Sequence, residues 1–262
     1  MRIWKTIAGG VAAAMISTAA FAADYKLTIA SWAPPTHGMN AKMWPGLIAK
    51  IEEATGGKVT AEIKYRLAPP PAMMDLIMDG AADMTWIFHG YSAGRFTATK
   101  LIELPGYEGS AEAASVAYWR VHEAHLAKLE EHKGVKVIGL MTHGPAQLHS
   151  AKKVSSLAEV SGMKLRVPGG VGGDVGAALG ATGIKVPAPK VYETLASNAA
   201  DGVVMPMEAR KGFKLTEVAQ NVYEMPGGLY RGSFALIMSQ ETFDSLPADI
   251  QKVLEERSLA NR

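Results

Sequence analysis

One segment occurs twice in this chain, 118 positions apart, at 71–86 and 189–204. Only a Pro and an Ala-Ala-Asp are identical, but the order of residue types is shared. Each copy has a Pro suited to a first helical turn, then an acid, then apolar residues. Gly80 and Asn198 follow, and both types tolerate the left-handed conformation that ends helices. Such units recur in any α/β protein, but the 118-residue spacing predicts two similar lobes with a ligand between them.

The first 22 residues have the pattern of a secretory signal peptide. Arg2 and Lys5 give a charged start, an apolar stretch follows, and Ala20-Phe21-Ala22 is an A-x-A cleavage site. The apolar stretch is short and interrupted by Gly, which argues against a membrane anchor. The chain has no Cys, and therefore no lipid-modified Cys after the signal. We expect residues 1–22 to be removed and the mature protein to be soluble in the periplasm.

The charge balance gives no sign of nucleic-acid binding. Removing Arg2 and Lys5 from 27 basic residues leaves 25, against 25 acidic residues, so the mature chain has a formal net charge of zero. A nucleic-acid-binding domain would be expected to carry an excess of basic residues. The apolar fraction of 48% is ample for folded cores.

Hydrophobic patterns predict alternating strands and helices, which is typical of an α/β protein with mostly parallel sheets flanked by helices. We expect a two-lobed periplasmic-binding-protein fold with the lobes joined by crossing strands, one lobe formed by 23–145 with 232–262 and the other by 146–231. A Gly-rich turn is expected at 169–173. The expected strands are 25–31, 58–65, 83–88, 135–141, 163–167, 184–187 and 232–239, and the expected helices are 40–55, 110–132, 174–179 and 246–262.

Arg166 is the first candidate for a binding residue. It lies in Lys164-Leu-Arg-Val-Pro168, ahead of a Gly-rich turn and a helix start. A guanidinium holds a carboxylate with two charge-assisted hydrogen bonds, and a helix N-terminus favours an anion. A structural salt bridge is the alternative role for this arginine.

The chain resembles the DctP-type extracytoplasmic solute receptors of TRAP transporters. The resemblance is carried by the block 157–168, which contains the Lys-Leu-Arg-Val-Pro motif, by Lys190-Val-Tyr-Glu-Thr-Leu195 and by Ala200-Asp-Gly202. It implies a periplasmic receptor, not an enzyme, that closes on an organic acid and delivers it to a membrane permease. It also implies that Arg166 binds the substrate carboxylate, and that further helices follow Arg262, so that this sequence is a fragment.

Two departures from the family pattern bear on the ligand. Ala146 stands where many members have a second ligand-contacting arginine, and Met205 stands where many have Asn. A multiply charged substrate is therefore not expected, and we predict an aromatic or aliphatic monocarboxylate, such as a hydroxy or keto acid. Candidate wall residues of the cleft are Trp32, Phe88, His89, His143, Gln147 and Met205.

An esterase is the main alternative. Gly90-Tyr-Ser92-Ala-Gly94 matches the G-x-S-x-G nucleophile elbow, which would make Ser92 a nucleophile. A hydrolase of this class needs its acid and then its His after the Ser, usually late in the chain. The last His is His149, followed by more than a hundred residues without one, so the order of residues argues against this function.

Cofactor and metal sites are not expected. The glycines at 169–173 lack the spacing of a dinucleotide or P-loop motif. Four residues on one predicted helix could suggest a metal site, but they form no H-E-x-x-H motif, and we interpret them as a solvated helix face. They are His122, Glu123, His125 and His132. His37, His89 and His143 follow three different strands, where they could contact a substrate oxygen.

Overall fold

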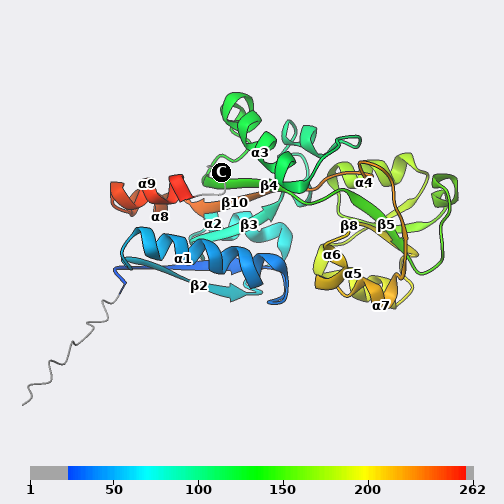
Figure 1. The fold of residues 1–262 in the computed structure, drawn as a ribbon, viewed down its shortest axis with the longest axis horizontal. Helices are drawn as coiled ribbons and strands as arrows, with labels where there is room; N and C mark the ends of the chain where they lie inside the picture. The colour runs from blue at the N-terminus through cyan, green and yellow to red at the C-terminus, as the bar shows by residue number, and fades with distance from the viewer. Residues whose placement is uncertain (1–22, 258–262) are drawn as a thin grey trace, which may run out of the picture.

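The computed structural model describes residues 23–257. The signal-peptide prediction for 1–22 lies outside this range. Among the described residues, no helix has the length and hydropathy needed to cross a membrane. The described chain forms two five-stranded sheets that lie side by side (Figure 1).

The first sheet contains strands from both ends of the described chain. Its first three strands run parallel, and β10 runs antiparallel to both of its neighbours. Four strands therefore share one direction, which confirms the predicted mostly parallel sheet. The order is β2 (Val59–Tyr65), β1 (Tyr25–Ser31), β3 (Met84–Phe88), β10 (Ser233–Ser239) and β4 (Val135–Thr142).

The second sheet repeats this topology. Its first three strands are again parallel, and β5 is antiparallel to β8 and β9. The strand order is β7 (Thr182–Lys185), β6 (Lys164–Val167), β8 (Gly202–Pro206), β5 (Ala146–Ser150) and β9 (Asn221–Tyr223). The chain passes from the first sheet to the second after β4 and returns after β9, so two crossing segments join the lobes, as expected.

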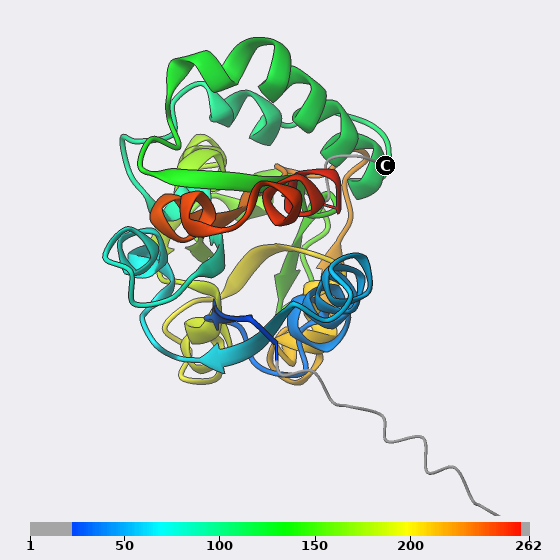
Figure 2. The ribbon, with the colours of Figure 1, turned by 90° about the vertical axis from the view of Figure 1, so that its left-hand side faces the viewer.

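Helices cover the faces of both sheets (Figures 1 and 2). With the first sheet lie α1 (Trp44–Ala54), α2 (Met73–Met78), α3 (Ala111–Val121), α8 (Gln240–Ser245) and α9 (Ala248–Arg257). With the second lie α4 (Gly170–Ala178), α5 (Val191–Ala196), α6 (Ala209–Gly212) and α7 (Leu215–Val218). Short 3₁₀ or π segments are η1 (Met39–Met43), η2 (Pro70–Ala72), η3 (His89–Tyr91), η4 (Thr99–Glu103), η5 (His122–Leu126), η6 (Ala127–Leu129), η7 (Leu157–Val160) and η8 (Ala188–Lys190).

The repeated segment has the same structure in both lobes. Each copy forms a 3₁₀ turn, a short helix and a strand, and all of their bounds differ by the same 118 positions. Gly80 and Asn198 both have positive φ, at 70° and 57°. The Asp that follows accepts a backbone N–H from the neighbouring parallel strand in each lobe, at 2.7 Å. The repeat therefore fixes how β3 and β8 enter their sheets.

One prediction for the second lobe was wrong, and two of its strands were missed. The glycines at 169–173 do not form a separate turn, because α4 already begins at Gly170. A Cβ at Gly172 would lie 2.9 Å from Pro168 Cγ, and one at Gly176 would lie 3.0 Å from Val167 Cγ1. The small residues thus let the helix pack closely on the strand before it. Strands β5 and β9 were not predicted at all.

Removal of the Asp83 side chain should destabilise the first lobe. Its Oδ2 accepts the N–H of Thr28, and its Oδ1 accepts the hydroxyl of Thr242 at 2.9 Å. We expect Asp83→Ala to lower the free energy of unfolding by about 1.5–3 kcal/mol, since hydrogen bonds to a charged group are lost. Urea denaturation measures this. Asp79→Ala, an exposed change in the same turn, is the control, and equal effects of the two changes would refute the role of Asp83.

Candidate functional site

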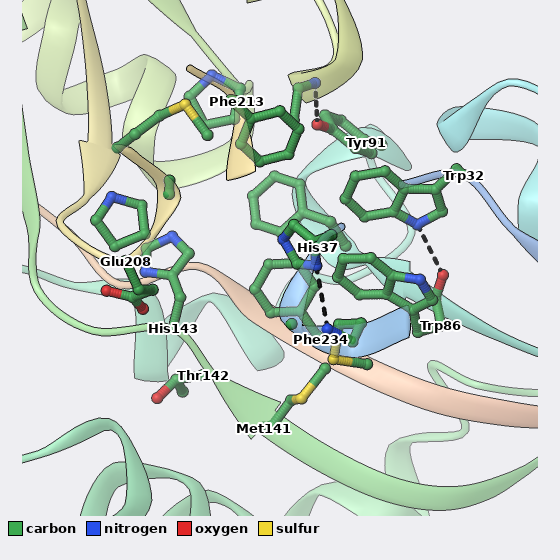
Figure 3. Close-up of a pocket in the computed structure, with 18 of the residues that line it drawn as sticks. Trp32, His37, Trp86, Tyr91, Met141, Thr142, His143, Glu208, Phe213 and Phe234 are labelled. Atoms are coloured by element: carbon green, nitrogen blue, oxygen red, sulfur yellow. Dashed lines mark hydrogen bonds between the residues drawn. The ribbon is translucent and has the colours of Figure 1, made fainter. Parts of the chain in front are cut away.

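A cavity of about 290 Å³ lies between the two lobes, beyond the strand ends. It is the arrangement expected for α/β sheets, in which ligands bind outside the carboxyl ends of parallel strands. Five of the predicted site residues line it, together with residues that the sequence did not suggest (Figure 3). These five are Trp32, Phe88, His143, Arg166 and Met205, and the cavity is also lined by His37, which the sequence suggested as a contact for a substrate oxygen.

Arg166 is a buried cation at this cavity. It lies in β6, is 1% exposed, and its Nε donates to Val186 O at 2.9 Å. Its Nη2 lies 3.5 Å from the hydroxyl oxygen of Tyr91 in the other lobe. Among residues 23–257, no carboxylate forms an ion pair with it. A buried charge without a counter-charge is costly, so the position favours an anionic ligand.

Aromatic rings form much of the cavity wall. Trp32 and Trp86 stack at 4.0 Å between centroids, and their indole N–H groups donate to Trp86 O and Ser31 Oγ. Because both N–H groups are satisfied within the fold, the two indoles offer only apolar ring surface to a ligand. The other aromatic side chains at the cavity are His37, Phe88, Tyr91, His143, Phe213, Tyr230 and Phe234.

The His143 ring has both nitrogens engaged by the main chain. Its Nε2 accepts the N–H of Gly232 at 2.9 Å, and its Nδ1 lies 2.6 Å from Gly144 O, so Nδ1 carries the proton. Burial lowers the pKa of His143 and keeps it neutral. His143 therefore presents its ring, with no free nitrogen, to the cavity.

His89 lies outside the cavity, in contrast to our expectation. Ser233 Oγ donates to Glu103 Oε1, so it accepts from His89 Nδ1, at 2.9 Å. His89 Nε2 is then the acceptor for His132 Nε2–H at 2.8 Å. Both ring nitrogens serve this internal chain of hydrogen bonds. The solvated face predicted for the helix histidines was also wrong, because His122 and His132 are buried.

Gln147 also lies away from the cavity. It belongs to the unpredicted strand β5, and its side-chain amide pairs with the main chain of Met225 through an accepted bond at 2.7 Å and a donated bond at 3.1 Å. The amide thus fixes the returning segment after β9. Gln147 was a candidate for binding because it is polar and follows the crossing segment. In β5 its side chain is directed to the main chain of Met225.

Ser92 is not placed as a catalytic nucleophile in the described part of the chain. Its hydroxyl forms no hydrogen bond with any histidine in the described part of the chain. The glycines of its motif have structural roles. A Cβ at Gly90 would lie 2.4 Å from the Phe88 ring, and Gly94 adopts a positive φ of 80°, which favours glycine. The informative residue of this motif is Tyr91, which the sequence did not single out. Within residues 23–257 no group of three or more His, Cys, Asp or Glu side chains is placed to hold a metal ion.

Tyr91 connects the two lobes at the arginine. Its hydroxyl oxygen accepts the N–H of Ala188 at 2.8 Å, besides its contact with Arg166. An oxygen that accepts from both groups keeps its own proton free to donate. The Tyr91 hydroxyl can therefore add a third donor to an anion held by Arg166.

Comparison with known proteins assigns the family. Residues 32–260 match the DctP model, which describes bacterial extracellular solute-binding proteins of family 7. The chain belongs to this family. It is thus a TRAP solute-binding protein, which confirms the resemblance and excludes the esterase alternative, since the family is not enzymatic.

Solved TRAP solute-binding proteins share its fold. One from Bordetella bronchiseptica, with bound (R)- and (S)-mandelate, is 38% identical, with a TM-score of 0.87 over 90% of this chain and 76% of that one. A marine-metagenome protein specific for aromatic acids, in complex with 3-hydroxybenzoate, is 30% identical, with a TM-score of 0.84 over 91% and 76%. The two-lobed architecture is therefore confirmed.

A curated relative is the outer membrane transporter protein TsaT of Comamonas testosteroni, which is 26% identical over 227 residues. That match covers 86% of this chain but only 66% of TsaT. The present chain thus corresponds to about two thirds of that relative's length.

The buried histidines should make this receptor less stable in acid. Burial lowers the pKa of His89, and that of His132 to about 3, whereas a histidine in an unfolded chain titrates near 6.5. Below that pH the unfolded state binds more protons. Stability is therefore full above pH 6.5 and falls as the pH drops toward 3, by up to about 1.4 kcal/mol per pH unit for each histidine.

Chemical denaturation between pH 7.5 and 5 tests this expectation. His132→Asn should flatten the pH dependence, while His125→Asn, at an exposed position, should leave it as in the wild type. Burial raises the pKa of Glu103, which acts in the opposite direction, so the comparison rests on the difference between variants. Equal slopes for the wild type and His132→Asn would contradict the prediction.

Proposed function

We propose that this protein captures a small aromatic monocarboxylate in the cavity between its lobes and delivers it to the membrane permease of a TRAP transporter. Arg166 holds the carboxylate, and the Trp32–Trp86 pair contacts the apolar body. The observation that carries the proposal is a buried guanidinium that forms no ion pair within residues 23–257 and lies in a cavity with a largely aromatic wall. The acids bound by the two solved relatives, mandelate and 3-hydroxybenzoate, support the same ligand class.

The permease and the route of export are parts of this proposal. Family membership supports a TRAP permease as the partner. The charged start, apolar stretch and A-x-A site of residues 1–22 support export to the periplasm by a cleaved signal peptide. We also propose 23–145 with 232–262 and 146–231 as the two lobes, which is supported by the strands that each sheet contains.

The contacts across the cleft support closure of the lobes around a ligand. Tyr91 of the first lobe contacts Arg166 and Ala188 of the second, and Gly144 N–H donates to Glu208 Oε1 at 2.7 Å. A ligand that bridges both lobes would stabilise the closed arrangement relative to an open one, as in hinge-closing receptors. The ligand carboxylate would be held at the side where Tyr91 meets Arg166.

Replacement of Arg166 tests the carboxylate clamp. Arg166→Gln should cost about 2–5 kcal/mol of binding free energy for benzoate or mandelate, because the ligand charge loses its buried partner. That is about 30-fold or more in Kd. Arg166→Lys keeps the charge but loses the planar fork, so it should recover only part of the affinity. Isothermal titration calorimetry of folded variants measures both.

Arg120→Gln, at an exposed position in α3, is the matched control and should bind as the wild type does. Circular dichroism verifies that each variant is folded. Wild-type affinity for benzoate in Arg166→Gln would refute the proposed clamp.

The Tyr91 hydroxyl should contribute to retention of the ligand. Tyr91→Phe removes the acceptor for Ala188 N–H and the contact with Arg166, so we expect about tenfold weaker binding. Faster dissociation should account for most of the loss, as is usual for changes at a preformed interface. Stopped-flow fluorescence measures the two rates, and Tyr107→Phe, at a residue that is 40% exposed, is the control. An unchanged dissociation rate would exclude this role.

A further inference from the structure

The cavity has a second polar side, which the proposed carboxylate clamp does not use. His37 and Glu208 both line the cavity, His37 in the loop after β1 and Glu208 just after β8. Figure 3 shows Glu208 and Tyr91 on opposite sides of the cavity, with His37 between them. Because the Arg166 guanidinium contacts the Tyr91 hydroxyl, Glu208 lies away from the clamp.

His37 offers a free hydrogen-bond donor. Its Nδ1 accepts the N–H of Met39 at 3.3 Å, and burial lowers its pKa, so the neutral ring carries its proton on Nε2. Within the described residues, Nε2 has no hydrogen-bond partner. The ring is held by stacking on Trp86 at 5.4 Å and by contact with Phe213 of the other lobe at 5.5 Å. Of the three histidines that follow strands, His89 and His143 have no such free nitrogen.

Glu208 brings a solvent-exposed carboxylate to this side of the cavity. Its Oε1 accepts the N–H of Gly144 in the crossing segment, and no cation of residues 23–257 forms an ion pair with it. Its charge acts on His37, where it opposes the effect of burial on the pKa. The negative charge of Glu208 would repel a second carboxylate on a ligand, whereas it would not repel a neutral hydroxyl.

We propose that His37 and Glu208 determine which aromatic acids are accepted. His37 Nε2–H donates to a neutral oxygen substituent on the ring of the bound acid, and Glu208 excludes a second carboxylate at the same side. The preferred ligands are then aromatic monocarboxylates that carry a ring hydroxyl. This inference rests on the proposed function, because it takes Arg166 as the group that orients the acid.

The ratio of the affinities of two acids, measured on the same variant, tests the inference. Such a ratio does not depend on how much a substitution changes the affinity for all acids together. Calorimetric titrations with benzoate, 3- and 4-hydroxybenzoate, isophthalate and terephthalate would be made on the wild type, His37→Phe and Glu208→Gln. The wild type should bind the better hydroxybenzoate about tenfold more tightly than benzoate, because the hydroxyl satisfies a donor that benzoate leaves unpaired. In His37→Phe, which keeps an aromatic ring in the stack, this ratio should fall toward one.

The dicarboxylates test Glu208 separately. The wild type should bind both dicarboxylates more weakly than benzoate. Glu208→Gln should raise their affinity relative to benzoate by about fivefold, as expected for removal of an exposed like charge. His125→Phe and Glu123→Gln, two exposed changes of the same type, should keep all of the wild-type ratios.

The outcomes separate this inference from the proposed function. Benzoate binding that depends on Arg166, combined with equal affinity for the hydroxybenzoates, would overturn the inference alone. A hydroxyl preference that persists in His37→Phe would also overturn it. Absence of binding for every acid of the panel, or benzoate binding unaffected by Arg166→Gln, would overturn the proposed function as well.

Discussion

The buried guanidinium of Arg166 is the constraint on which the binding site depends. A cation that is 1% exposed and has no ion-pair partner among the described residues is costly in the empty protein. Its own hydrogen bonds, to Val186 O and toward Tyr91, orient the side chain without neutralising it. The surrounding rings offer few polar groups, so a ligand carboxylate in contact with them would be attracted to Arg166 more strongly than in bulk water. Charge recognition and an apolar cavity thus reinforce each other.

The duplicated architecture explains how this charge reaches the cleft. Both sheets place three parallel strands beside an antiparallel strand contributed after a crossing, so their carboxyl ends face a common space. The repeated Asp, at 83 and 201, ties the strand after each repeat to its parallel neighbour. Arg166 in β6 and Trp86 in β3 therefore face one cavity from different lobes. Tyr91 then links the lobes directly at the arginine.

Local patterns allowed much of the fold to be predicted from the sequence. The repeat and the alternating strands are each encoded within a few residues. Arg166 stood out because its motif is short and specific. The strand β5 was not recognised, so the bond between the Gln147 side chain and the main chain of Met225 was not foreseen.

Contacts between residues that are distant in the sequence could not be predicted from local sequence patterns. His89 is diverted from the cleft by Ser233 and His132, which lie 144 and 43 positions away. Tyr91 and Glu208 lie at the cavity because the two lobes contact each other there. The sequence around each of these residues gives no indication of that contact. The G-x-S-x-G match drew attention to Ser92, although its neighbour Tyr91 occupies the cleft. The side chains that surround a ligand are thus the least predictable part, since the fold brings them together from distant segments.

A crystal structure of the mature protein with bound benzoate would test the central claim most directly. The expected result is a carboxylate held by both Nη atoms of Arg166 or by one Nη and the Tyr91 hydroxyl, with the ring against the Trp32–Trp86 pair. A benzoate bound in another cavity, or one in this cavity with its carboxylate away from Arg166, would contradict it.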